Sequence, residues 1–318
     1  MIMNLFDLHC DTIGECHRQR KNLFDNDLHL SLCKGKYLDK WCQVFAVWIP
    51  DDIRGEDAFT YFKQAHGTFR REMALNSSVI QHCHTGSDIA DSLASGKRAA
   101  ILSVEGGAAA AGSLEKLRQL NGMGVKQITI TWNGSNEVGN GCLSEDKSGL
   151  TAFGKRFVAE MERLNMVIDV SHLNEKGFFD IAETTAGPFV ASHSNCTGVF
   201  PHKRGLNDSQ IKTVIARGGL IGVNFYQKFL CRGKRGILDA VYRHITHILD
   251  SGGRDAVALG SDFDGCALGS ELGGIDRLPA LWDYLVGRGF TVETIDKLFF
   301  SNAMRFYQTV LQSKINTV

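Results

Sequence analysis

Short apolar runs rich in β-branched residues alternate with stretches of helical periodicity along nearly all of this chain of 318 residues. Continuous apolar runs of this kind are typical of parallel strands that helices cover on both faces. The eight predicted strands are 5–9, 41–49, 99–104, 127–132, 166–171, 188–192, 220–226 and 256–261. Eight such units predict an α/β fold, a (β/α)8 TIM-type barrel, with an extra C-terminal helix at about 291–313 packed outside it.

Helical spacing of apolar residues supports the segments between the predicted strands. The clearest predicted helices are 56–75, 151–164 and 236–250. Polar residues placed to cap helix N-termini are Asn174, Asp208 and Thr291. Since no linker rich in Pro, Gly or Ser interrupts the pattern, we expect a single domain over residues 1–318.

Charge and cysteine content exclude several classes of protein. The 35 basic and 35 acidic residues cancel, which argues against a partner such as nucleic acid or an acidic membrane surface. The N-terminus has no basic region before an apolar run, and no apolar run reaches the ~18 residues of a membrane span, so we expect neither a signal peptide nor a membrane anchor. Nine cysteines without paired spacing indicate reduced thiols and a cytoplasmic protein.

Six side chains that bind metals or carry protons stand where predicted strands end. They are His9, Asp11, Glu105, His172, His193 and Asp262. The carboxyl ends of the strands of a barrel meet at one face, which is where barrel enzymes place their active sites. The sequence therefore predicts that these six side chains lie together.

The ligand types and their spacing predict a site for two metal ions. His9 and Asp11 share a face of an extended segment because strand side chains alternate with a period of two. The carboxylate of Glu105 has two oxygens and can bridge, while His172 and His193 add two imidazoles. We expect one ion on His9, Asp11 and Glu105, and a second on Glu105, His172 and His193. Such ligands suit two Zn²⁺ ions bridged by Glu105 and a water or hydroxide, with Mn²⁺, Co²⁺ or Fe²⁺ left open.

Asp262 ends the eighth predicted strand in the segment GSDFDG. A carboxylate beside an activated water can take its proton and return it to a leaving amine, so Asp262 is the predicted catalytic acid and base. Asp264 in the same segment is predicted to form a turn or to support the site from outside. The long segments 10–40 and 133–150 are expected to cover the substrate.

Motifs over almost the whole chain resemble the membrane (renal) dipeptidase family of zinc peptidases, which have amidohydrolase-like barrels. The similar segments are LFDLHCDT, SVEGG, TAFGKRFVAEMERLNMVIDVSHLNEKGF, ASHSN, PHKRGLND, GVNFY and GSDFDG. The resemblance implies a soluble, bacterial-type dipeptidase that releases free amino acids and accepts a D-residue at the C-terminal position. It also implies that Asp262 is catalytic and that Arg204 holds the carboxylate of the substrate. Trp132 stands where the family often has a histidine that stabilises the oxyanion, and we expect it at the substrate site.

Two other functions remain open at this point. The same site could act on N-acyl amino acids, lactones or other small amides, and the indole at Trp132 is the reason to consider them. A barrel that binds metal without catalysis is the third hypothesis, because function depends on the site and not on the fold. The expected partner is a small-molecule dipeptide, with no nucleic acid and no membrane, and the resemblance allows a homodimer.

Overall fold

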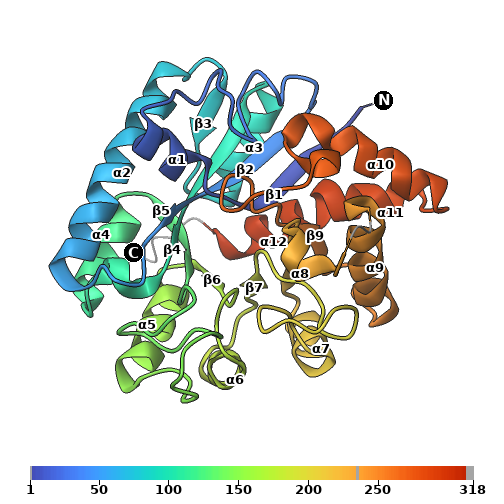
Figure 1. The fold of residues 1–318 in the computed structure, drawn as a ribbon. Helices are drawn as coiled ribbons and strands as arrows, with labels where there is room; N and C mark the ends of the chain where they lie inside the picture. Colours follow the sequence, from blue (N-terminus) through green and yellow to red (C-terminus); the bar gives the residue numbers. More distant parts are fainter. Residues whose placement is uncertain (1, 234–235, 313–318) are drawn as a thin grey trace.

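The computed structural model describes residues 2–233 and 236–312. Within these ranges nine strands pair in parallel in the order β2-β1-β9-β8-β7-β6-β5-β4-β3, and a further pairing of β2 with β4 closes eight of them into a barrel. Figure 1 shows the strands at the centre with the helices around them. The predicted (β/α)8 barrel is confirmed.

The strands are short and almost entirely buried, as expected for strands that helices cover. The barrel strands are β1 (Leu5–Cys10), β2 (Trp41–Trp48), β4 (Arg98–Glu105), β5 (Val125–Thr129), β6 (Val167–Asp169), β7 (Val190–Ala191), β8 (Leu220–Val223) and β9 (Val257–Leu259). The register of β2 against β4 places Trp48 beside Glu105 at the carboxyl end of both strands.

Helices follow the strands around the barrel. The α-helices are α1 (Thr12–Gln19), α2 (Gly55–Leu75), α3 (Gly86–Ala94), α4 (Leu114–Gly122), α5 (Ala152–Arg163), α6 (Glu175–Thr184), α7 (Asp208–Ala216), α8 (Gln227–Leu230), α9 (Ile237–Asp250), α10 (Leu278–Gly287), α11 (Val292–Asp296) and α12 (Asn302–Val310). Short 3₁₀ turns are η1 (Gly107–Ala110), η2 (Ser270–Leu272) and η3 (Ile275–Arg277), and η4 (Lys297–Ser301) is a π-helical turn. No helix in the described ranges combines the length and the apolar character that crossing a bilayer requires.

Two differences from the predicted strands have physical reasons. A ninth strand, β3 (Ile80–His82), pairs with the first residues of β4 outside the closed barrel, and its three residues are too few to produce a recognisable apolar run. Four predicted strands, 127–132, 166–171, 220–226 and 256–261, end early, at Thr129, Asp169, Val223 and Leu259. The residues that follow leave the ladder and turn towards the mouth of the barrel.

Two of the three predicted N-caps are confirmed. The side chain of Asn174 accepts a hydrogen bond from the backbone N–H of Gly177, and that of Thr291 accepts one from the backbone N–H of Thr294. The prediction of Asp208 was wrong, because Asn207 caps α7 and shares reciprocal bonds with Gln210 in a capping box.

The predicted C-terminal helix is present but interrupted, and residue 313 at its expected end lies outside the described residues. The π-helical turn η4 separates α11 from α12. The ring of Tyr307 on α12 packs 4.7 Å from that of Phe6 on β1, and its hydroxyl donates to Gln127 on β5. These strands are not neighbours, so α12 lies across the end of the barrel opposite the carboxyl ends and not outside it; Figure 1 shows α12 behind the strands.

Replacing Tyr307 should therefore destabilise the fold without touching the mouth of the barrel. We expect Tyr307→Phe to cost about 1–3 kcal/mol, because it removes the donor to a buried amide oxygen. Tyr307→Ala should cost more, about 3–5 kcal/mol, since it also leaves a cavity. Urea unfolding measures both. Leu75→Ala on an exposed position (71%) is the control and should stay within about 0.5 kcal/mol. A Tyr307→Phe variant as stable as the wild type would contradict this account of α12.

Candidate metal centre

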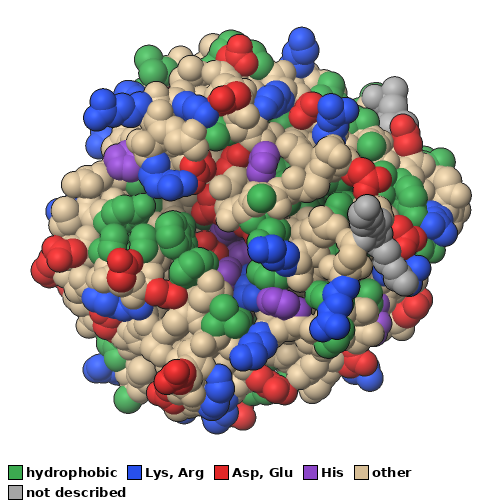
Figure 2. Space-filling model, in the orientation of Figure 1, with side chains coloured by type: hydrophobic (Ala, Val, Ile, Leu, Met, Phe, Trp, Pro, Cys, Tyr) green, Lys and Arg blue, Asp and Glu red, His purple; other side chains and the backbone are tan. Residues whose placement is uncertain are grey.

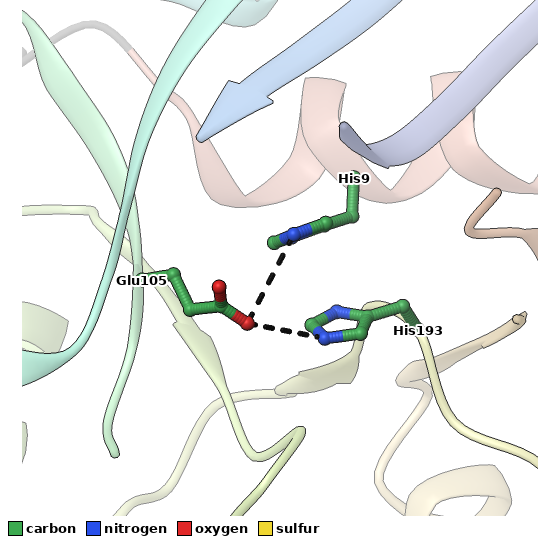
Figure 3. Close-up of side chains that lie close together, drawn as sticks. All are labelled: His9, Glu105 and His193. Atoms are coloured by element: carbon green, nitrogen blue, oxygen red, sulfur yellow. Dashed lines mark ion pairs between the residues drawn. The ribbon is translucent and has the colours of Figure 1, made fainter. Parts of the chain in front are cut away.

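The structure brings the predicted ligands together at the carboxyl ends of the strands. One oxygen of Glu105, Oε1, lies 3.0 Å from His172 Nε2, 3.2 Å from His193 Nε2 and 3.9 Å from His9 Nε2. Figure 3 shows His9 and His193 with their rings directed at the Glu105 carboxylate, each from a different strand end. Side chains separated by up to 184 positions thus face one oxygen atom.

Two carboxylates complete the group on the other side of His9. The Nε2 atom of His9 lies 3.3 Å from Asp11 Oδ2 and 3.9 Å from Asp262 Oδ1. Ligand atoms within 4.8 Å of one another form two triads that share His9, one with Glu105 and His193 and one with Asp11 and Asp262. Asp262 therefore lies within the group of possible ligands and not only beside it.

Hydrogen bonds to the Nδ1 atoms of His172 and His193 determine which nitrogen of each ring carries the proton. Ser192 donates its single hydroxyl hydrogen to Asp169 Oδ2 at 2.6 Å, so at 2.7 Å it must accept from His193 Nδ1. His172 Nδ1 likewise donates to the side-chain oxygen of Asn133 at 3.0 Å. With both Nδ1 atoms protonated, the Nε2 atoms present lone pairs.

These lone pairs face each other and a carboxylate, an arrangement that a bound cation would stabilise. His172 Nε2 and His193 Nε2 are only 2.9 Å apart. Burial lowers the pKa of both imidazoles, which keeps them neutral, and Asp11 Oδ1 is buried without a hydrogen-bond donor. Neutral imidazole and carboxylate are the ligands that zinc and related ions bind. The donor set therefore fits divalent metal ions.

The pKa shifts of Glu105 and His9 also favour a cation at this site. Burial raises the pKa of Glu105 well above its usual value, although the neighbouring charge of His9 opposes this. Burial lowers the pKa of His9, but the charges of Glu105, Asp11 and Asp262 outweigh it and raise the pKa to about 10. Positive charge is therefore stabilised at this position, and a divalent ion would supply more of it than one protonated imidazole.

Asp262 is held in place by the backbone and by one amide. Burial raises its pKa to about 6 against the opposing charge of His9, and Asn224 Nδ2 donates to its Oδ2 at 2.9 Å. Both Asp262 (φ 61°) and His172 (φ 68°) adopt the left-handed region that non-glycine residues avoid, at sharp turns after β9 and β6. These turns direct the side chains into the mouth of the barrel.

Asp264 does not join the candidate metal ligands. Its carboxylate accepts a hydrogen bond from Thr12 Oγ1 at 2.5 Å and so supports the segment 10–40.

A cavity of about 430 Å³ opens above the ligands, and Figure 2 shows it as a central hollow with acidic and histidine side chains at its floor. Its lining residues are Asp11, Gly14, Glu15, His17, Arg18, Val47, Trp48, Tyr61, Ala65, Glu105, Trp132, Asn133, His172, Tyr226, Phe229, Asp262, Asp264, Gly265 and Cys266. The segment 10–40 contributes to this wall through α1, and the segment 133–150 contributes through Asn133. Trp132 lies in the wall of this cavity.

Arg204 occupies a separate position. It lines a smaller cavity of about 210 Å³ that shares His172 with the larger one. The guanidinium is buried, donates to the carbonyl of His193 at 3.2 Å and lies 5.6 Å from the centre of the Phe229 ring. Its Nε–H has no hydrogen-bond partner within residues 2–233 and 236–312. A buried cation with an unused donor beside the ligands is suited to an anionic group.

Sequence reasoning missed the residues that orient the ligands. Ser192 directly precedes a predicted ligand, but nothing in the pattern distinguishes it from an ordinary serine. Asn133, Asp169 and Asn224 lie on other strands or loops than the side chains they bind. Trp48 falls inside the predicted strand 41–49, and the sequence pattern gives it no role in a site. The ladder contact with Glu105 that gives Trp48 its position exists only in the closed barrel.

Comparison with known proteins agrees with this geometry. Residues 2–317 match the profile of Membrane dipeptidase (Peptidase family M19). An uncharacterised protein in the pqqA 5′ region of Klebsiella pneumoniae is 34% identical over 258 residues, 78% of this chain and 92% of that protein. An uncharacterised dipeptidase of Schizosaccharomyces pombe is 34% identical over 222 residues, 67% of this chain and 53% of that protein.

Solved structures of metallopeptidases share the whole fold. The dipeptidase AC, a metallopeptidase of family M19, superposes with a TM-score of 0.92 and 27% identity over 98% of this chain and all of that chain. A metallopeptidase from Rhodobacter sphaeroides, bound to a phosphinate mimic of the dipeptide L-Ala-D-Ala, superposes with a TM-score of 0.91 and 27% identity over the same shares. The chain therefore belongs to the membrane dipeptidase family, peptidase family M19, and is a metal-dependent hydrolase of peptide bonds.

Proposed function

We propose that the chain is a binuclear zinc dipeptidase that hydrolyses dipeptides to free amino acids. The observation that carries this proposal is the pair of unprotonated imidazole nitrogens 2.9 Å apart, facing one buried carboxylate oxygen. In this proposal His9, Asp11 and Glu105 hold one ion, and Glu105, His172 and His193 hold the other. Bound ions would supply Lewis acidity to the scissile carbonyl and to the attacking water.

Asp262 is the proposed proton carrier. Its Oδ2 accepts from Asn224, which leaves Oδ1 directed towards the metal ligands at 3.9 Å from His9 Nε2. In the unprotonated form this oxygen can take a proton from the attacking water, and in the protonated form it can give that proton to the leaving amine. A carboxyl whose pKa is raised to about 6 exchanges a proton readily near neutral pH.

Arg204 is the proposed anchor for the C-terminal carboxylate of the substrate. Its buried guanidinium has an unused Nε–H and lies next to His193, so a carboxylate bound there would present its peptide bond to the ligands. The free α-amino end would then extend into the larger cavity, where Trp132 forms part of the wall. Acceptance of a D-residue at the C-terminal position is supported by the Rhodobacter sphaeroides relative, which binds a mimic of L-Ala-D-Ala.

Chelation should abolish hydrolysis of L-Ala-D-Ala, and zinc should restore it, because the lone pairs of the site have no other partner. Elemental analysis of the zinc-loaded chain should give about two ions, one per ligand set. His193→Ala should lower the count and the activity. His247→Ala is the control, since that imidazole binds Asp208 away from the site. A zinc-loaded chain that holds one ion would contradict the binuclear site, and equal turnover of N-acetylated L-Ala-D-Ala would favour an N-acyl amino acid hydrolase.

Asp262→Asn should lower kcat by roughly 10²–10⁴-fold, the usual contribution of a positioned acid or base. The amide keeps the shape of the side chain but cannot accept the proton, so zinc content and KM should change little. Steady-state kinetics with elemental analysis separates these effects. Asp276→Asn, at an exposed position, is the matched control. A zinc-loaded Asp262→Asn enzyme with the kcat of the wild type would exclude the proposed role.

Arg204→Ala should raise KM for dipeptides by about 10- to 100-fold, the equivalent of a lost charge-assisted hydrogen bond of about 1.5–3 kcal/mol. Dipeptide amides, which lack the carboxylate, should be hydrolysed equally by both enzymes. Arg254→Ala is the control, because that guanidinium pairs with Glu293 on the surface. An unchanged KM for Arg204→Ala would assign the carboxylate to another residue.

A further inference from the structure

Two tryptophans form an aromatic wall on one side of the larger cavity. Trp48 ends β2 and Trp132 follows β5, and their rings pack edge to face with centroids 4.9 Å apart. Both line the cavity together with Val47, Tyr61 and Ala65. The Trp48 indole N–H has no hydrogen-bond acceptor among the described residues, so ring packing holds the pair.

Trp48, one of the two rings of this aromatic wall, stands across the barrel from Arg204, while Trp132 follows β5, between the strands of Glu105 and His172. In the closed barrel β2 and β7 are four strands apart in either direction, which makes them opposite. Trp48 ends β2, whereas Arg204 lies in the loop after β7, and Glu105 and His172 stand on β4 and after β6 between them. Figure 2 shows hydrophobic side chains on the side of α2 and α4 beside the hollow and basic side chains across it.

Two polar side chains on the same rim, those of Arg18 and His17, already have partners. Arg18 pairs with Glu15, and His17 Nδ1 lies 2.9 Å from Thr68 Oγ1. A charged side chain of the substrate would compete with these contacts, whereas an apolar ring could pack on the two indoles directly. Burial of an aromatic side chain against aromatic rings is favourable both by area and by edge-to-face packing.

We infer that the Trp48–Trp132 wall selects dipeptides with an aromatic or large apolar side chain at the N-terminal residue. This inference rests on the proposed function, because the anchor at Arg204 sets the direction of the substrate. With the carboxylate at Arg204 and the scissile bond at the ligands, the N-terminal side chain extends towards the opposite wall. Trp48 and Trp132 are then specificity-determining residues of the dipeptidase reaction.

The test is a series of Xaa-D-Ala dipeptides assayed with the zinc-loaded, full-length enzyme, where Xaa is Gly, Ala, Leu, Phe or Trp. We expect kcat/KM for Phe-D-Ala and Trp-D-Ala to exceed that for Gly-D-Ala by about 10- to 100-fold. Trp48→Ala and Trp132→Ala should each lower the ratio of Phe-D-Ala to Gly-D-Ala by about tenfold, mostly through KM. Trp48→Phe, which keeps a ring, should retain most of the preference.

Trp282→Phe is the matched control, because Trp282 is buried in α10 away from the cavity, and both the ratio and the rates should stay as in the wild type. Zinc content and the thermal midpoint identify variants that fail to fold. Equal kcat/KM across the series, with good turnover, would overturn the inference and leave the dipeptidase proposal intact. A series with no turnover of any free dipeptide would overturn both.

Discussion

The buried carboxylate of Glu105 is the constraint on which the rest of the site depends. Three imidazole nitrogens, from His9, His172 and His193, lie within 3.9 Å of one of its oxygens. A buried carboxylate is costly unless positive charge compensates it, and two of these imidazoles are neutral. The barrel must therefore hold the strand ends rigidly enough to keep a site for cations, which is the property of a metal-dependent hydrolase.

The same network joins the site to the barrel. Asp169 on β6 accepts from Thr129 on β5 and from Ser192 after β7, and Ser192 in turn orients His193. The hydrogen bonds that connect three strands thus also determine which nitrogen of His193 is protonated. A change in the packing of these strands would therefore shift the imidazole nitrogens of the site.

The two ends of the barrel differ in a way that explains where the chemistry occurs. At one end Tyr307 of α12 reaches in and binds Gln127, so that end is filled. The π-helical turn η4 directly precedes α12, and π-type turns are one of the known causes of kinks in helices. At the other end the strands are short, and the residues that follow them form turns. These turns carry several of the candidate ligands and leave space above them for the cavity.

The order of amino acids by itself predicted the barrel and the candidate ligands, because both depend on local regularities. Apolar β-branched runs predict strands, and the period of two in His9-x-Asp11 places both groups on one face. The tertiary structure alone decided the partners of those ligands, such as Asn133 for His172 and Asn224 for Asp262. It also decided that Trp48 faces Arg204 across the site and that α12 fills the far end. These relations join residues far apart in the chain, and they arise only when β2 pairs with β4 and the sheet closes, an event that no local pattern encodes.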